Sequence, residues 1–194
     1  MVKMSKEKAL KDIEISVFEC KKCELYKTRK NPVFGFGSTN SEIFFIGEAP
    51  GRNEDLQGLP FVGRAGKLFD ELLNSVDLTR KEVYITNILK CRPPKNRNPL
   101  KSEIEQCRGY LEKQIKIIKP KIIVTLGNFA SSFVFDLFKL NNSKISEIHG
   151  KVFQSKKEDT DIKIIPQYHP AFAIYNPNNK KILLKDFTII KEYK

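Results

Sequence analysis

The segment from Ser41 to Gly51, SEIFFIGEAPG, constrains the fold of this chain more than any other stretch. Its apolar run Ile43–Ile46 stops abruptly at Gly-Glu-Ala-Pro-Gly, which is typical of a buried parallel strand that delivers a tight loop. In open α/β sheets ligands bind outside the carboxyl ends of the strands, so the glycine-flanked Glu48 marks a candidate site. An ordinary strand-to-helix turn is the alternative. A phosphate-binding P-loop is excluded, because Gly51 is not followed by the required Gly-Lys-Ser/Thr.

Strand-like and helical patterns alternate along the rest of the chain. Apolar runs predict strands over 43–46, 83–86, 122–126 and 162–165, and helical spacing predicts helices over 4–19, 67–76, 99–118, 129–140 and 180–191. Glycine, proline and charged residues predict loops after Cys23 and over 55–66. The expected fold is therefore a single α/β domain over residues 1–194: a three-layer sandwich with a central four-stranded parallel sheet and helices on both faces.

The charge balance favours a polyanionic partner. The chain has 35 Lys and Arg against 23 Asp and Glu, a formal net charge of +12, which makes nucleic acid the leading candidate and a solvated lysine-rich surface the alternative. Enrichment in Lys and Glu without tryptophan also fits a thermophile or an AT-rich genome. The N-terminus is charged throughout, and no uncharged apolar run approaches the roughly 18 residues of a membrane span, so we expect a cytoplasmic protein without a membrane segment.

All of the cysteines fit one metal site. The chain contains four, Cys20, Cys23, Cys91 and Cys107, and disulfides are the less expected use in an intracellular protein. Four thiolates suit either structural zinc or an iron–sulfur cluster, and the spacing alone does not separate the two, although the second Cys-x2-Cys knuckle of a zinc ribbon is missing.

The segment between Cys91 and Cys107 is basic and contains two prolines in succession. Held at both ends by candidate metal ligands, it is predicted to contact DNA phosphates, with a solvated charged loop as the alternative. The candidate phosphate contacts are Arg92, Lys95, Arg97 and Lys101.

Two polar side chains follow strands at the expected site edge. Asn87 ends the second predicted strand, and His169 follows the fourth. His149 lies in Ile-His-Gly and is expected to be in a turn. A lone histidine is more often structural than catalytic, but His169 falls on the edge where ligands bind.

Several motifs together resemble the family 4 uracil-DNA glycosylases, which are thermostable iron–sulfur enzymes. They are Gly47–Gly51, Gly58–Gly63, Thr86-Asn87, Lys90–Pro94 and His169–Ala171, and with the cysteines they span about Cys20 to Ala171 in order. The resemblance implies base excision repair: hydrolysis of the N-glycosidic bond of deoxyuridine, in single- and double-stranded DNA, to free uracil and an abasic site. It also implies a 4Fe-4S cluster on the four cysteines, with structural zinc as the alternative.

The resemblance further implies roles for individual residues. Uracil would stack on Phe61, and the Asn87 amide would read O4 and N3–H. The backbone of Glu48 and Ala49 and the side chain of His169 would bind O2, beside Gly47. Glu48 and His169 would be catalytic. Ala49 stands where family 1 enzymes carry an aspartate, so the group that activates water is left open, with Glu48 as the candidate.

A wedge that fills the gap left by a flipped base is implied after the histidine. Phe172 and Tyr175 are the expected DNA contacts, and Ile174 is a third candidate for the wedge. We expect a monomer that acts on uracil-containing DNA, with a replication clamp or polymerase as a candidate partner. The rival hypothesis is a non-catalytic iron–sulfur DNA-binding module on the same fold, which would not need Glu48, Asn87 and His169 together.

Overall fold

A mixed sheet forms the centre of the protein. The computed structural model describes residues 5–157 and 160–193, and in them six strands pair in the order β1-β3-β2-β4-β6-β5. The inner four strands are parallel, as predicted, and β1 and β5 pair antiparallel at the two edges. The strands are β1 (Phe36–Gly37), β2 (Ile43–Gly47), β3 (Tyr84–Asn87), β4 (Ile122–Leu126), β5 (Phe153–Lys157) and β6 (Thr160–Gln167).

The predicted strand count of four was wrong, because both edge strands lack a sequence signal. β1 has only two residues and lies in a glycine-rich stretch. β5, FQSKK, is mostly polar and has no alternating apolar pattern. Both form because a buried neighbouring strand offers them a row of backbone hydrogen-bonding groups.

Each predicted helix is present, although one lies partly outside the described residues and the bounds shift by a few residues. The helices are α1 (Lys6–Phe18), α2 (Arg52–Gln57), α3 (Arg64–Ser75), α4 (Lys101–Ile118), α5 (Asn128–Leu137), α6 (Ile145–Ile148), α7 (Ala171–Tyr175) and α8 (Lys180–Phe187). Short 3-10 turns cover Glu24–Lys27, Pro94–Asn96, Pro177–Asn179 and Thr188–Glu192, so the last predicted helix is divided. Residue 4, the expected start of the first helix, lies outside the described residues.

The predicted loop over 55–66 was wrong in part, because α2 occupies its beginning. The Glu54 carboxylate accepts a hydrogen bond from the Gly51 N–H at the start of this helix, and Gly58 ends it with φ +72°. Helix α3 then begins at Arg64, three residues before its predicted start at Lys67.

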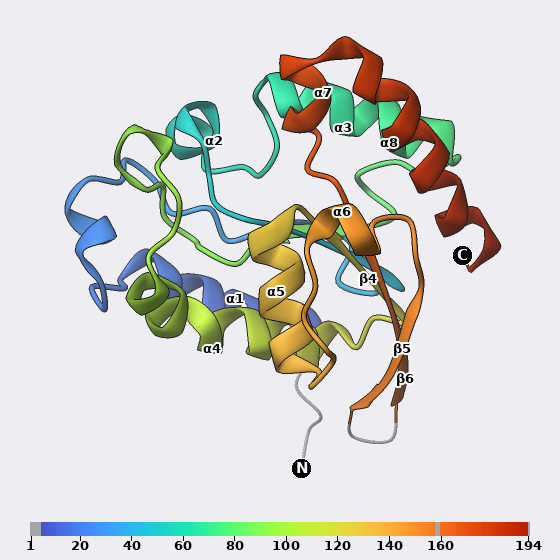
Figure 1. Ribbon diagram of the computed structural model, residues 1–194. Coiled ribbons are helices and arrows are strands. Elements are labelled where there is room, and N and C mark those ends of the chain that lie inside the picture. Colours follow the sequence, from blue (N-terminus) through green and yellow to red (C-terminus); the bar gives the residue numbers. More distant parts are fainter. Residues whose placement is uncertain (1–4, 158–159, 194) are drawn as a thin grey trace.

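Helices cover both faces of the sheet, which confirms the three-layer prediction (Figure 1). Helices α1, α4 and α5 share one buried apolar cluster with the sheet, and α3, α7 and α8 share a second. Within β2, Phe44 faces the first cluster and Phe45 the second, because successive side chains of a strand point to opposite faces. Burial on both faces explains why the run Ile43–Ile46 is apolar without alternation.

The order of the strands fixes where a ligand would bind. β2 lies between β3 and β4, so the chain winds to both sides of it, and ligand crevices form at such switch points outside the carboxyl ends of the strands. The register pairs Gly47, the last residue of β2, with Asn87, the last residue of β3. His169 follows the end of β6, which lies two strands away from β2 in the sheet.

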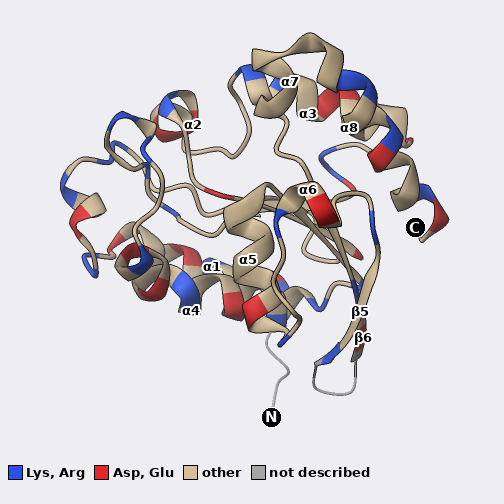
Figure 2. Cartoon of the chain, in the orientation of Figure 1, with Lys and Arg blue, Asp and Glu red and all other residues tan. Residues whose placement is uncertain are grey.

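Most charged residues are at least partly exposed, whereas Asp55, Lys90 and Glu103 are buried. Figure 2 shows Lys and Arg distributed over both helical layers with acidic residues between them. In the part of the chain that the structure describes, no helix is both long enough and apolar enough to cross a membrane.

Candidate functional site

A pocket of about 470 Å³ lies at the carboxyl ends of β2, β3 and β6. Every predicted uracil-binding residue except Gly47 lines it, so the structure brings together residues that are up to 121 positions apart in the chain (48 to 169). Its walls are Glu48, Ala49, Pro50, Gly51, Glu54, Phe61, Ala65, Asn87, Pro93, Asn96, Arg97, Asn98, His169, Ala171 and Tyr175.

Gly47 lies behind the pocket and allows two of its walls to meet. A Cβ atom at this position would come within 2.4 Å of Asn87 Oδ1 and 2.7 Å of Phe61 Cζ. Both distances are too short for non-bonded atoms, so only glycine fits without displacing the amide or the ring. Gly47 therefore leaves the space that Asn87 and Phe61 occupy, and its predicted part in uracil binding stays a prediction.

Phe61 forms an apolar wall of the pocket. Its ring is stacked against that of His169, with centroids 5.7 Å apart and an interplanar angle of 27°, and it packs on Phe69 at 5.0 Å. Its backbone has φ +54°, a left-handed conformation that is unfavourable for a bulky residue. Backbone strain of this kind persists only where the surroundings impose it.

His169 is held as a neutral side chain with a defined tautomer. Its Nδ1 accepts a hydrogen bond from the Ala171 N–H at 3.1 Å, which leaves the proton on Nε2. Burial lowers the pKa of His169 to about 4, and the nearby Glu54 carboxylate offsets only part of this shift. At neutral pH His169 therefore offers an uncharged N–H donor. Gly127 packs behind it, since a Cβ there would lie 3.2 Å from His169 Cβ.

Glu48 follows β2, and Asn87 is the last residue of the neighbouring strand β3. Burial raises the pKa of the Glu48 carboxyl. The loop after β3 is tied to β2 by hydrogen bonds from Ile88 N–H to Gly47 O and from Leu89 N–H to Glu48 O. Asn87 is 2% exposed, so its amide is presented in a largely desolvated position.

Glu54 is a pocket residue that the sequence interpretation missed. Its carboxylate accepts hydrogen bonds from the N–H groups of Gly51, Val62 and Gly63 at 2.8 to 3.1 Å. It thereby joins the loop after β2 to the loop that carries Phe61. A signal was available: a glutamate three residues after a helix-starting position is typical of a capping box.

The basic segment forms one rim of the pocket through Pro93, Asn96, Arg97 and Asn98. Arg97 makes a bidentate ion pair with Glu103, with nitrogen–oxygen distances of 2.9 and 2.5 Å. Its guanidinium is therefore already paired with a carboxylate of the same chain. Arg92 donates to Asn96 Oδ1 at 2.7 Å. Lys95 and Lys101 are exposed.

The two aromatic residues expected to contact DNA differ in their surroundings. Phe172 does not line the pocket, and its ring stacks on Tyr168 with a centroid distance of 4.2 Å. Tyr175 stands at the pocket rim with 86% of its surface exposed.

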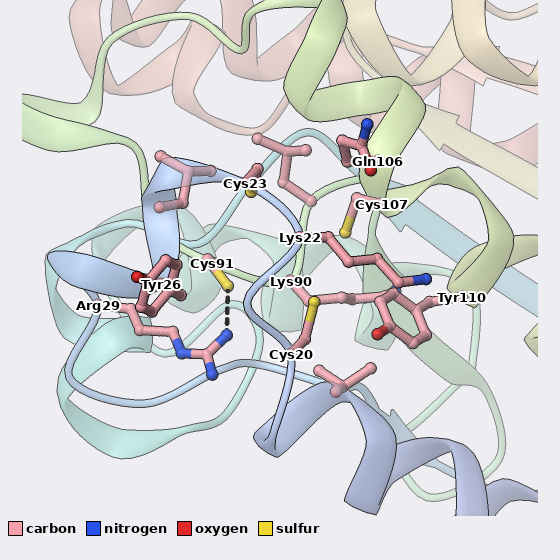
Figure 3. Close-up of a pocket in the computed structure, with 13 residues that line it drawn as sticks. Cys20, Lys22, Cys23, Tyr26, Arg29, Lys90, Cys91, Gln106, Cys107 and Tyr110 are labelled. Carbon is pink, nitrogen blue, oxygen red and sulfur yellow. Dashed lines mark hydrogen bonds between the residues drawn. The ribbon is translucent and has the colours of Figure 1, made fainter.

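The four cysteines line a second pocket, between the end of α1, the 3-10 turn after Cys23, the segment after β3 and α4 (Figure 3). Their side chains converge from these separate elements, and Arg29 Nη1 donates to Cys91 Sγ at 3.1 Å. Arg29 had no sequence signal. Within the described residues, no three His, Cys, Asp or Glu side chains are placed to hold a single metal ion. Burial raises the pKa values of Cys23 and Cys91, and it raises that of Cys107 to about 11.

Lys90 connects the two pockets. It lines the cysteine pocket, and its buried ammonium donates to Asn87 O at 2.8 Å, Thr86 Oγ1 at 2.6 Å and Gln114 Oε1 at 2.7 Å. Desolvation lowers its pKa to about 7. The strand end that carries Asn87 is therefore fixed from the side of the cysteines.

Comparisons with known proteins agree with this geometry. The model of the Uracil DNA glycosylase superfamily matches residues 34–189. A type-4 uracil-DNA glycosylase of Archaeoglobus fulgidus is 48% identical over 184 residues, which are 95% of this chain and 92% of the relative. Type-4 enzymes of Sulfurisphaera tokodaii and Saccharolobus solfataricus are each 48% identical, over 95% and 91% of this chain and 84% and 82% of their own. The chain therefore belongs to the uracil-DNA glycosylase superfamily and, within it, to the type-4 uracil-DNA glycosylases.

Proposed function

We propose that this protein removes uracil from DNA by hydrolysing the N-glycosidic bond of deoxyuridine. The observation that carries the proposal is the meeting of Phe61, Asn87 and His169 around one pocket. An aromatic face, a buried amide and a neutral N–H donor are the groups that a planar base with two carbonyl oxygens and an N–H requires. Because a duplex hides the glycosidic bond, the nucleotide must be flipped into this pocket, and single-stranded DNA avoids part of that cost.

Base recognition follows from the hydrogen-bonding capacity of Asn87. Its NH2 group would donate to uracil O4, and its Oδ1 would accept from N3–H. Cytosine presents the opposite polarity at both positions, so it would leave the buried amide unpaired. Discrimination of about 10⁴-fold is reached when the wrong ligand leaves buried polar groups without partners.

Catalysis requires stabilisation of opposite charges on the two fragments. As the bond breaks, negative charge develops on the uracil ring, where the Nε2–H of His169 would donate to O2 together with the backbone amides after β2. A neutral donor suits this role, because it strengthens its hydrogen bond as the charge develops without binding anions beforehand. Positive charge develops on the sugar, where the ionised Glu48 carboxylate would lie opposite and orient the attacking water.

Contacts to the DNA backbone and to the gap in the duplex belong to the pocket rim. We assign the phosphate contacts mainly to Arg92, Lys95 and Lys101. Arg97 is the weaker candidate, because its guanidinium is paired with Glu103. Tyr175 is the better wedge candidate, because it is exposed at the rim while Phe172 is stacked on Tyr168. Tyr175→Ala should lower excision from duplex DNA several-fold more than excision from single strands, whereas Phe172→Ala should lower thermal stability.

A 4Fe-4S cluster is the cofactor that the cysteine pocket fits best. The four thiols come from separate elements and line one pocket, and an iron–sulfur cluster accepts four thiolates from scattered positions. Structural zinc is the alternative, although a zinc ribbon usually has a second Cys-x2-Cys knuckle and this chain has only one. Bound there by Cys20, Cys23, Cys91 and Cys107, the cluster would serve as a structural cross-link.

The test is incubation of the purified protein with a uracil-containing oligonucleotide, followed by alkali to cleave abasic sites. Strand cleavage at the uracil position is expected on single- and double-stranded DNA without added metal or nucleotide. The matched cytosine oligonucleotide should stay intact. Protein that binds DNA but yields no alkali-labile sites above background would favour the non-catalytic module. The monomeric state, recruitment by a clamp or polymerase, and the cytoplasmic location stay predictions from the sequence.

A further inference from the structure

The strained backbone of Phe61 needs an external support. Phe61 is 5% exposed, it forms a wall of the uracil pocket, and its φ of +54° lies in the left-handed region. A phenylalanine relaxes to extended φ values unless its neighbours prevent this. The position of the ring on which the base would stack is therefore set by whatever holds this backbone.

Arg80 contacts the backbone of Phe61 directly. Its Nη2 donates to Phe61 O and, at 3.4 Å, to Gly66 O, and its Nη1 donates to Pro60 O at 2.9 Å. The Nε donates to Asp70 Oδ1 at 2.5 Å, so the guanidinium is anchored on α3. The guanidinium also lies over the ring of Phe69, 5.9 Å from its centroid, and that ring packs on Phe61.

Gly66 also packs closely against the same carbonyl. A Cβ atom at position 66 would lie 1.8 Å from Phe61 O, so the backbone of Phe61 rests against the first turn of α3. Contacts with both Gly66 and Arg80 therefore constrain the peptide group after Phe61. The planar guanidinium of an arginine carries five N–H donors in a rigid fork, so it can hold these carbonyls and Asp70 in one fixed geometry, whereas a lysine has three donors on a flexible stem.

Behind the Phe61 wall there is room for the loop to move. A further pocket, of about 350 Å³, is lined by Phe61 itself and by Arg80, Leu59, Val62 and Phe36 among others. Without Arg80, the segment that carries Phe61 could relax into this space and take the ring away from the base. Packing on the Phe69 and His169 rings thus leaves open space on one side of this loop.

We infer that Arg80 is a positioning residue for uracil excision: it holds the aromatic wall of the pocket in its strained, base-stacking conformation. The inference rests on the function proposed above and extends it to a residue that does not line the uracil pocket. Arg80 would not touch the substrate, so its effect passes through Phe61.

The experiment compares Arg80→Gln with a matched control, Arg108→Gln. Arg108 has a similar exposed side-chain fraction, 27% against 22%, pairs with Glu112 and Asp136, and lies over the Phe133 ring at 5.4 Å. Both variants should lose thermal stability. Only Arg80→Gln should lower kcat/KM on single-stranded uracil DNA and weaken inhibition by free uracil, each by about tenfold, because it removes hydrogen bonds that shape the base site.

Two further variants keep the inference testable if Arg80→Gln folds poorly. Arg80→Lys should retain the contact with Asp70 and show a smaller loss in both measurements. In a Phe61→Leu background, Arg80→Gln should have much less additional effect than in the wild type, because residues that act through one another are non-additive.

The outcomes separate this inference from the proposed function. A wild-type protein without uracil excision would overturn the function. An active wild type with Arg80→Gln kinetics and uracil inhibition within twofold of the Arg108→Gln control would overturn the role of Arg80 alone. Full additivity with Phe61→Leu would likewise show that Arg80 does not act through the ring.

Discussion

The uracil pocket and the cysteine pocket lie on either side of Lys90 and are built in different ways. In the proposed uracil pocket, contacts within the chain already hold two of the functional residues: Lys90 donates to the backbone carbonyl of Asn87, and the Ala171 N–H donates to His169 Nδ1. In the cysteine pocket, burial raises the pKa of three of the four thiols, so the pocket favours neutral thiols and not thiolates. The first site is preorganised by the fold, and the second needs a cation or cluster to hold its ligands ionised.

Substitutions in the two pockets should therefore have different effects. Changes in the uracil pocket should alter the chemistry and leave the fold in place. Changes in the cysteine pocket should alter stability first, and DNA binding through the basic segment that begins at Cys91.

The largest effect is expected for His169→Leu, which keeps the bulk of the side chain and removes the donor. Removing one donor from an oxyanion-type site costs about 10²- to 10³-fold in kcat. The control is His149→Leu, because His149 pairs with Asp186 at 2.6 Å and does not line the pocket. Single-turnover excision of uracil measures both, and a loss below tenfold in His169→Leu would exclude a direct contact with the departing base.

The next effect concerns Asn87→Asp, which retains an acceptor and loses the donor toward O4. An unsatisfied buried group costs about 1 to 3 kcal/mol, and a charged carboxylate facing O4 costs more. Most uracil activity should be lost. A slow release of cytosine should be gained, since N4–H2 can donate to the carboxylate, and it should be strongest from mismatched or single-stranded sites.

Asn128→Asp provides the control for that exchange. Asn128 uses only its Oδ1, which accepts from the Ile145 N–H at 3.0 Å, and an aspartate can do the same. Near-normal uracil excision by Asn87→Asp would show that this amide does not read the base edge.

Cys91→Ala tests the other side of the comparison. It should lower Tm by several degrees and weaken DNA binding several-fold, because Cys91 joins the cysteine pocket to the basic segment. The brown absorbance of a 4Fe-4S cluster should be present in the wild type and reduced in the variant. A colourless protein prepared anaerobically with stoichiometric zinc would contradict the cluster assignment.

The smallest effect is a gain in stability. Burial raises the pKa of Glu48, so above that pKa the folded protein carries a carboxylate that is less favourable than in the unfolded chain. Glu48→Gln should therefore raise Tm modestly at pH 7, and the difference should vanish below about pH 4, where the unfolded carboxyl is protonated too. Activity should fall in the variant, and in the wild type as the pH drops through the raised pKa. If Glu48→Gln had a Tm equal to or lower than that of the wild type at pH 7, burial would not be destabilising the Glu48 carboxylate.

The sequence predicted what depends on strong local patterns. The buried run of β2 and the turn after it predicted the edge of the sheet where the site lies. The set of motifs predicted Phe61, Asn87 and His169 as site residues, and the structure places all three around one pocket. Edge strand β5 was missed because its residues carry no apolar pattern and pair only where β6 is already in place.

Contacts between distant segments could not be predicted from the sequence. Arg80 supports Phe61 from 19 positions away, and Arg29 reaches Cys91 from 62 positions away. Neither has a spacing or neighbouring residue that distinguishes it from the many other basic side chains. Their roles depend on tertiary proximity alone.

The most direct test of the central claim is a crystal structure of the protein with free uracil, the product of the proposed reaction. The ring of uracil should stack on Phe61, with O4 and N3 within hydrogen-bonding distance of the Asn87 amide and O2 near His169 Nε2. The pocket residues should move little, because the fold already holds them. Uracil bound elsewhere, or a pocket that must rearrange around Asn87 and Phe61 to accept it, would contradict a preorganised site.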